Sequence, residues 1–267
     1  MASRLVKILT RFSGCFYVTR SLIQSIYFAL KLGRNEKSSI KFNKNHVLQL
    51  RKNESDQEVF LTTFVDQYHR SPFDLGQTPV IVDLGSNIGL TMVDFKQQYP
   101  FARIVGVEMD KENYECCKVN ISQFSDCTVL NAAVWKENGS INYKGENEQS
   151  YSVEKTSFGS GGMVPCITMD ELFKENAIVK ADYIKMDIEG AEKAILLEST
   201  SKKWLQQVRY LSLELHDLPD MDNIVLSKNI KMELEANQFI VYKLAKHWSS
   251  LFAINKLWHH SMEGNQS

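Results

Sequence analysis

The chain has 267 residues, 43% of them hydrophobic, which is enough for one large domain with a sizeable core and favours a soluble enzyme. Its formal net charge of −1 excludes the strongly basic surface of a protein that lives on nucleic acid. The five cysteines have neither the paired spacing of zinc sites nor the density of a disulfide framework. We therefore expect reduced thiols and a cytoplasmic location.

Residues 1–38 are expected to form a basic, amphipathic helical extension. All charged residues before Glu36 are basic: Arg4, Lys7, Arg11, Arg20, Lys31 and Arg34. Apolar residues recur with helical spacing in two stretches, which predicts two helices, and the run 21–30 is too short to span a bilayer. Three interpretations stay open: packing on the domain or on a partner, peripheral contact of residues 1–34 with an anionic membrane, and an organelle presequence.

Residues 39–78 are expected to lead into the main domain. Alternation over 40–49 predicts a short β-hairpin, and the pattern over 56–68 predicts a helix. From residue 79 to 258, short β-branched runs alternate with helical stretches. This pattern is typical of a doubly wound, mostly parallel α/β sheet, and residues 259–267 form a polar tail.

The elements of this domain can be assigned from the same alternation. The predicted strands are 79–85, 102–108, 127–134, 181–187 and 209–216, and the predicted helices lie near 88–98, 111–123, 191–198 and 223–236. Two closing runs from Phe239 and Leu251 have no helix between them, so they predict an antiparallel hairpin at the sheet edge. The polar, Gly- and Ser-rich stretch 138–163 is expected to be either a loop over the open end of the sheet or a solvated excursion.

A glycine-containing turn follows the first predicted strand. It contains Asp83, Gly85, Asn87 and Gly89, and in a doubly wound sheet this turn is where nucleotide-like ligands bind. Glycine lets the backbone approach a ligand closely, and the next helix offers free N–H groups to an anionic end such as an amino-acid carboxylate. The G-x-N-x-G spacing disfavours a pyrophosphate cofactor, whose usual motif is G-x-G-x-x-G.

Two further positions suit the rest of such a ligand. Glu108 ends the next predicted strand, about 20 residues on, where an acid can accept hydrogen bonds from ribose hydroxyls. Asn131 begins a run of small residues that leaves room for an adenine ring.

Acidic residues and one histidine follow the last two parallel strands. Asp187 and Glu189 end one strand, and Glu214 and His216 lie two residues apart at the end of the next. The carboxyl ends of neighbouring parallel strands meet at one edge, so these side chains are expected to converge.

With these motifs the chain resembles the FkbM family of S-adenosylmethionine-dependent methyltransferases. The matching stretches are VDLGSNIG (82–89), GVEMD (106–110), NAAVW (131–135), VPCITMDEL (164–172), IKMDIEGAE (184–192), LELH (213–216) and YKLA to LFAINK (242–256). Small departures are Ser86, where the family has alanine, and Met186, where it has leucine or valine. The resemblance implies a class I methyltransferase sheet of seven strands with the last antiparallel, and O-methylation of sugars or natural products.

The implied reaction is direct displacement of the sulfonium methyl group by a hydroxyl oxygen of a small-molecule or glycan acceptor, with no nucleic acid involved. Asp83, Gly85, Asn87 and Gly89 are then expected around the methionine end of the cofactor, Glu108 at the ribose and Asn131 near the adenine. Asp187 is expected closest to the transferred methyl group.

His216 is the preferred general base because its unperturbed pKa lies near operating pH, with Glu189 or Glu214 orienting it or acting instead. Metal-free catalysis is preferred over a divalent ion held by these four side chains. Two other functions stay open: a nicotinamide-dependent oxidoreductase and a non-catalytic, methyltransferase-like binding protein.

Overall fold

A seven-stranded sheet forms the centre of the computed structural model, which describes residues 2–33, 38–42, 46–52, 54–145, 151–154, 163–218, 220–244 and 250–258. The strand order is β12-β13-β11-β10-β3-β4-β5. The strands are β3 (Val80–Leu84), β4 (Arg103–Glu108), β5 (Cys127–Asn131), β10 (Ala181–Met186), β11 (Val208–Glu214), β12 (Phe239–Lys243) and β13 (Ser250–Asn255). The expected doubly wound sheet with an antiparallel last strand is confirmed.

The expected antiparallel hairpin at the sheet edge is confirmed. Strand β13 pairs antiparallel with both β11 and β12, so β12 is the outer strand of the hairpin and forms this edge of the sheet. All six residues of β13 are buried, whereas β12 alternates between buried and exposed positions. A strand that is buried on both faces has a continuous apolar run, and residues 251–254 (LFAI) are such a run.

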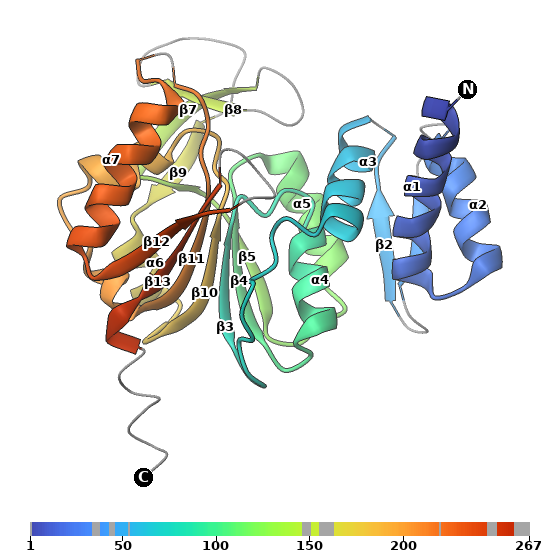
Figure 1. Cartoon of the computed structure of the whole chain (residues 1–267), viewed down its shortest axis with the longest axis horizontal. Coiled ribbons are helices and arrows are strands. Elements are labelled where there is room, and N and C mark those ends of the chain that lie inside the picture. The colour runs from blue at the N-terminus through green and yellow to red at the C-terminus, as the bar shows by residue number, and fades with distance from the viewer. Residues whose placement is uncertain are drawn as a thin grey trace.

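Helices cover both faces of the sheet (Figure 1). Helices α4 (Leu90–Gln98) and α5 (Lys111–Ile121) lie on one face, and α6 (Met169–Glu175) and α7 (Asn223–Ala236) on the other. Alternation along β10 divides the core: Tyr183 packs with the α4 and α5 side chains, while Ile184 packs with those of α6 and α7.

The helices begin where the sequence provides caps. Asp110, Thr168 and Asp222 each accept a hydrogen bond from a backbone N–H in the first turn of α5, α6 and α7. The predicted helix near 191–198 is instead a short π-helical segment, Ala194–Glu198, and a 3₁₀ segment, Lys203–Gln207, precedes β11.

The N-terminal elements pack at one end of the molecule, beside α4 (Figure 1). They are α1 (Ala2–Thr19), α2 (Leu22–Gly33), the antiparallel hairpin of β1 (Ser38–Phe42) and β2 (His46–Leu50), and α3 (Glu54–Leu61) followed by a π-helical segment, Thr62–Asp66. Among the helices that the structure describes, none has the length and apolar content needed to span a bilayer.

The polar stretch 138–163 is not a plain loop. Its described part contains β7 (Gly139–Gly145), β8 (Tyr151–Glu154) and the start of β9 (Met163–Ile167), which form a second sheet with β6 (Ala133–Val134) in the order β6-β9-β7-β8. Residues 146–150 and 155–162 of that stretch lie outside the described residues. High Gly and Ser content concealed these strands because it lacks the β-branched runs on which strand prediction rests.

Candidate active site

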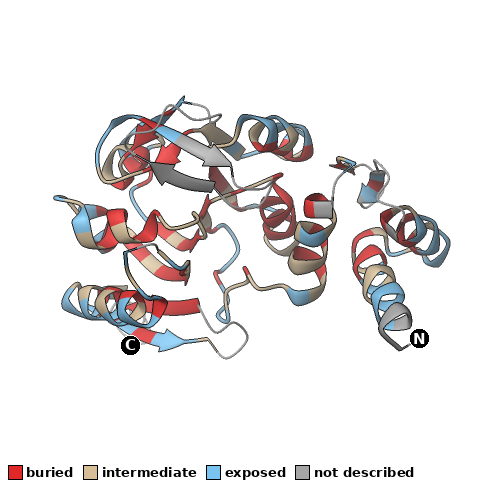
Figure 2. Ribbon diagram, turned by 90° about the horizontal axis from the view of Figure 1, so that it is seen from above, coloured by how far each residue is buried: buried red, intermediate tan, exposed pale blue. Residues whose placement is uncertain are grey.

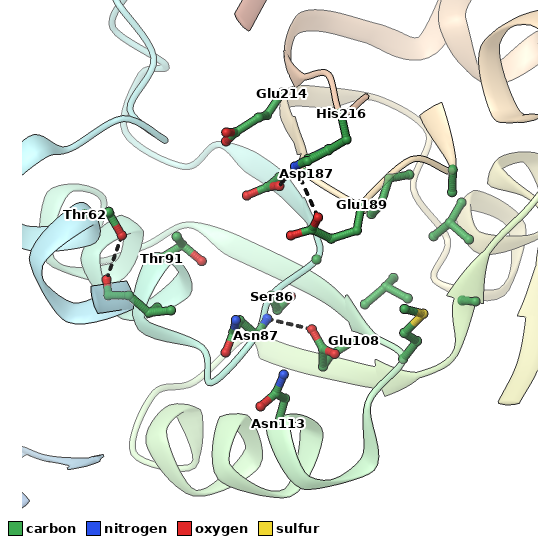
Figure 3. A pocket seen from close by; sticks show the side chains of 18 of the residues that line it. Thr62, Ser86, Asn87, Thr91, Glu108, Asn113, Asp187, Glu189, Glu214 and His216 are labelled. Carbon is green, nitrogen blue, oxygen red and sulfur yellow. Dashed lines mark hydrogen bonds and ion pairs between the residues drawn. The ribbon is translucent and has the colours of Figure 1, made fainter. Parts of the chain in front are cut away.

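A cavity of about 440 Å³ opens at the carboxyl ends of β3, β4, β10 and β11. This is the edge at which ligands bind in doubly wound sheets, and the volume is in the range of small-molecule sites. Figure 3 shows two groups of side chains facing each other across it: Asp187, Glu189, Glu214 and His216 on one side, and Asn87, Glu108 and Asn113 on the other.

The turn after β3 and the end of β4 form a wall suited to a nucleoside. Gly85 lines the cavity with φ of 79°, and a Cβ there would lie 1.8 Å from the carbonyl oxygen of Asp187. Glu108 accepts hydrogen bonds from the backbone N–H groups of Asn87 (2.7 Å) and Asp110 (2.8 Å), one at each carboxyl oxygen. The carboxyl group is therefore fixed in orientation, and each oxygen keeps a lone pair for a ribose hydroxyl.

Glu108 is buried, and its pKa reflects that burial. Removal from water raises the pKa to about 7, although the two backbone N–H groups oppose the shift by favouring the charged form.

Three of the six residues expected to bind cofactor do not line the cavity. Fully buried Asp83 accepts a hydrogen bond from the Thr91 hydroxyl and pairs with Lys185, 3.5 Å away. Gly89 allows close helix packing, since a Cβ there would lie 2.7 Å from the Cys117 sulfur. The Asn131 amide donates to the carbonyl oxygens of Glu108 and Met109 and so ties β5 to the end of β4. These residues support the cavity wall from behind.

The four residues expected to carry catalysis all line the cavity, and three of them converge. The Nε2 atom of His216 lies 3.5 Å from Asp187 Oδ1 and 3.4 Å from Glu189 Oε2 (Figure 3). Its other ring nitrogen, Nδ1, lies 3.3 Å from Glu192 Oε1. One imidazole therefore contacts three carboxyl groups.

This cluster shifts the protonation of its members. Burial lowers the pKa of His216, but the hydrogen bond and charge of Glu192, with Asp187 and Glu189, outweigh that effect and raise it to about 10. Burial raises the pKa of Glu189 to about 7, opposed by His216. The choice of His216 as base rested on an ordinary imidazole pKa, because the sequence indicates which acids are near the ring but not their distances from it.

Asp187 has the opposite shift. Burial raises its pKa, but Lys185 and His216 dominate and lower it below the usual value. The Nζ atom of Lys185 lies 3.3 Å from Asp187 Oδ2 and donates to the Gly85 carbonyl oxygen at 2.9 Å. Lys185 thus links the turn at Gly85 to the acidic cluster at Asp187.

Three residues of this region were not anticipated as site residues. Lys185 and Glu192 lie within the IKMDIEGAE stretch, and buried Glu192 accepts the backbone N–H groups of Ile188 and Gly190, which fixes the turn after β10. Tyr68 lines the cavity and donates to Asp187 Oδ2 at 3.2 Å. It follows the N-terminal π-helical segment, and its sequence context gives no signal of this role.

The same cluster has the composition of a possible cation site. One ligand atom each from Asp187, Glu189 and His216 lie within 4.8 Å of one another. Oxygen and imidazole ligands in this arrangement suit Mg²⁺ or Mn²⁺.

Comparison with known proteins identifies the family. The family model described as the methyltransferase FkbM domain matches residues 83–245. A search of curated protein sequences finds no match.

Solved structures with a similar chain trace share little sequence with this protein. Fibrillarin from Methanococcus jannaschii, a pre-rRNA processing protein, is 11% identical, with 83% of each chain covered and a TM-score of 0.47. Aeropyrum pernix fibrillarin with bound S-adenosyl-L-methionine is 10% identical, covering 70% of this chain and 71% of that one, with a TM-score of 0.44. Magnesium protoporphyrin IX methyltransferase from Synechocystis PCC 6803 is 12% identical, covering 68% of this chain and 72% of that one, with a TM-score of 0.38.

Because the FkbM model spans more than half of the chain, this protein belongs to the FkbM methyltransferase family and is an S-adenosylmethionine-dependent methyltransferase.

Proposed function

We propose that the protein transfers the methyl group of S-adenosylmethionine to a hydroxyl oxygen of a sugar or another small-molecule or glycan acceptor. The observation that carries the proposal is the cluster of Asp187, Glu189 and His216, which shares one cavity with the nucleoside wall at Glu108. A hydroxyl group becomes a useful nucleophile when a positioned base takes its proton, and this cluster supplies such a base. The family assignment shows that the nicotinamide-dependent alternative is wrong.

The residues that line the cavity fit this cofactor. Gly85 and Asn87 would lie along its methionine end, Glu108 would accept the ribose hydroxyls, and the small side chains of Ala132 and Ala133 leave space for the adenine. When bound, S-adenosylmethionine supplies an electrophilic methyl group on sulfur.

Glu189 is our candidate for the proton acceptor. With a pKa raised to about 7 by burial, its carboxyl group exchanges a proton near neutral pH. His216, with its pKa raised to about 10, is protonated under the same conditions and acts as a charged partner that orients Glu189 and the acceptor hydroxyl. Asp187 lies between Lys185, Tyr68 and His216 and holds this arrangement in place.

The charge of the cavity favours a neutral or cationic acceptor. Its described lining has one cationic side chain, protonated His216, against six acidic side chains: Glu58, Asp66, Glu108, Asp187, Glu189 and Glu214. Lys185 lies next to the cavity, but Asp83 and Asp187 neutralise its charge. A phosphate or carboxylate on the acceptor would be repelled, whereas the hydroxyl groups of a neutral sugar can donate to these carboxylates.

The test is incubation with S-adenosylmethionine labelled in its methyl group, using neutral glycosides, amino sugars, sugar phosphates and uronic acids as acceptors. We expect labelled O-methyl products from the neutral or cationic acceptors, identified by mass and by the methyl carbon chemical shift. Glu189→Gln is the matched inactive variant. Label on nitrogen or carbon, or a preference for the anionic acceptors, would contradict the proposal. Cofactor binding with no turnover on any acceptor would favour the non-catalytic alternative.

A further inference from the structure

Helices α1 and α2 each have a buried apolar face. The two faces contain Cys15, Val18, Phe28, Ala29 and Leu32. These side chains share one core with Phe60 and Phe64, in the segment that leads into the sheet, and with Leu90 and Val93 of α4. The two helices are therefore packed into the fold. This burial disfavours a presequence, because removing these helices would open a core that includes the first helix of the sheet domain.

The same two helices carry a second apolar face that the described structure leaves exposed. Its side chains are between 39% and 82% exposed: Val6, Leu9, Phe16, Leu22, Ile23, Ile26, Tyr27 and Leu30. On α1 these positions recur at helical spacing, and on α2 they fill one side of the helix. Figure 2 shows exposed positions along the outer sides of both helices. Such a concentration of large apolar side chains marks a contact surface.

Basic residues accompany this exposed face. Lys7 and Arg20 are exposed, and half-buried Lys31 lies over the Tyr27 ring with its Nζ atom 5.0 Å from the ring centroid. Arg11 differs, because it turns inward and donates to Gln57 at 2.8 Å. No acidic residue occurs before Glu36, although the whole chain has a net charge of only −1. The helices that carry the exposed apolar face thus contain basic residues and no acidic ones.

We propose that the exposed face of α1 and α2 docks on an anionic lipid bilayer, with its apolar side chains at the headgroup boundary and its basic side chains on the lipid phosphates. Basic amphipathic helices that lie in the membrane interface have this combination of features. Neither helix is long and apolar enough to cross the bilayer. A symmetric contact with a second copy would bring together two surfaces whose charged residues are all basic, which charge repulsion opposes.

The surface does not depend on the identity of the methyl acceptor. The cavity is lined by the segment 58–68 and by the carboxyl edge of the sheet, and no residue of α1 or α2 is part of its described lining. Membrane docking and methyl transfer can therefore be measured separately.

The test is co-sedimentation of the full chain with phosphatidylcholine vesicles, with and without phosphatidylglycerol. We expect the parent protein to bind the anionic vesicles. The triple substitution Leu22→Ser, Ile23→Ser and Ile26→Ser should weaken this binding by about tenfold or more. The matched control is Val179→Ser with Ile224→Ser, which removes apolar side chains of similar exposure (74% and 78%) from other surfaces. It should bind as the parent does. The pair Lys7→Gln and Lys31→Gln should weaken binding by about fivefold per charge, and only to anionic vesicles.

Three results would overturn the proposal. The first is a parent protein that does not bind anionic vesicles, and the second is a triple variant that binds them as tightly as the parent. The third is a parent that forms dimers in analytical ultracentrifugation and binds no vesicles, with a triple variant that is monomeric, since the face then belongs to a second copy of the chain.

Discussion

Glu189 has a backbone φ of 54°, a left-handed conformation that ordinary side chains adopt rarely and at some cost in free energy. The next residue, Gly190, also has a positive φ, of 102°. Glu192 holds this turn by accepting two of its N–H groups. The carboxyl group of this strained residue lies 3.4 Å from the His216 ring. Backbone strain of this kind is concentrated at functional sites, which supports a functional role for Glu189.

The protonation of Glu189 predicts the pH dependence of turnover. A carboxyl group must be ionised to accept a proton, so kcat should rise with pH through a pKa of about 7. In Glu189→Gln we expect kcat to fall by about 10²- to 10⁴-fold and the rising limb to disappear, with cofactor affinity nearly unchanged. Steady-state kinetics across pH, with calorimetry for the cofactor, measures both quantities.

Replacement of His216 distinguishes the two candidate bases. The imidazolium lowers the pKa of Glu189, so His216→Gln should move the rising limb to higher pH without abolishing it. If His216→Gln instead removes the limb while Glu189→Gln retains it, His216 is the base.

Glu108→Gln should weaken S-adenosylmethionine binding. The amide replaces one carboxyl oxygen, so it can no longer accept from both Asn87 and Asp110 and still receive two ribose hydroxyls. The expected loss is about 1.5 to 3 kcal/mol, as for hydrogen bonds to charged groups. Calorimetry measures it, and exposed Glu112→Gln in α5 is the control. Equal affinity in both variants would place the ribose elsewhere.

Helix α1 approaches the segment after β2 closely at Gly14. A Cβ there would lie 3.0 Å from a ring carbon of Phe60 and 3.1 Å from a methyl carbon of Val65. Gly14→Val should therefore lower the free energy of unfolding by about 1 to 3 kcal/mol through overpacking. Its neighbour Ser13 is exposed on the same helix, so Ser13→Val is the control. Urea denaturation compares the two, and a Gly14 variant as stable as the parent would show that α1 does not pack here.

A buried ionic cluster joins α1, the segment after the π-helix, and α4. Asp94 is fully buried and accepts hydrogen bonds from Arg70 at two positions (2.8 Å each) and from Tyr17 (3.1 Å), with His69 at 2.9 Å. Burial raises the Asp94 pKa, but the hydrogen bonds and charges of His69 and Arg70 lower it overall. The stabilisation is thus present above the unfolded pKa and lost as pH falls through the lowered folded value.

Asp94→Asn tests this cluster. It should destabilise the protein by about 3 to 5 kcal/mol at neutral pH, because it leaves the guanidinium of Arg70 without its charge partner. The variant should also lose less stability on acidification than the parent. Urea titrations at neutral and acidic pH measure both effects, with exposed Asp74→Asn as the control. Parallel pH profiles for parent and Asp94→Asn would contradict the argument.

Across the molecule, the contacts between helices and strands are easier to predict from the sequence than the side chains that line the cavity. The βαβ alternation identified the sheet and brought Asp187 and His216 to one edge, since strand ends converge by topology alone. Whether a side chain at that edge faces the cavity depends on the local turn, and Asp83 and Asn131 face away from it. Tyr68 could not have been predicted, because its contact with Asp187 joins residues 119 positions apart.

The protein as a whole should be active without added metal. Proton transfer to Glu189 needs no Lewis acid, so turnover in chelator-treated enzyme should equal that of the untreated enzyme. Loss of activity with chelator and its return with Mg²⁺ or Mn²⁺ would assign Asp187, Glu189 and His216 as ligands. Calorimetric titration of each ion into the cofactor complex provides an independent measurement.

One wall of the cavity is formed by Glu58, Thr62, Asp66 and Tyr68, which precede the residues matched by the family model. This wall and the nucleoside wall at Gly85 and Glu108 are therefore encoded in separate stretches of the gene. We expect exchange of residues 54–68 between relatives to change which acceptor is methylated and to leave cofactor affinity unchanged, which product analysis and calorimetry would measure. Substrate choice would then be inherited as a module of its own.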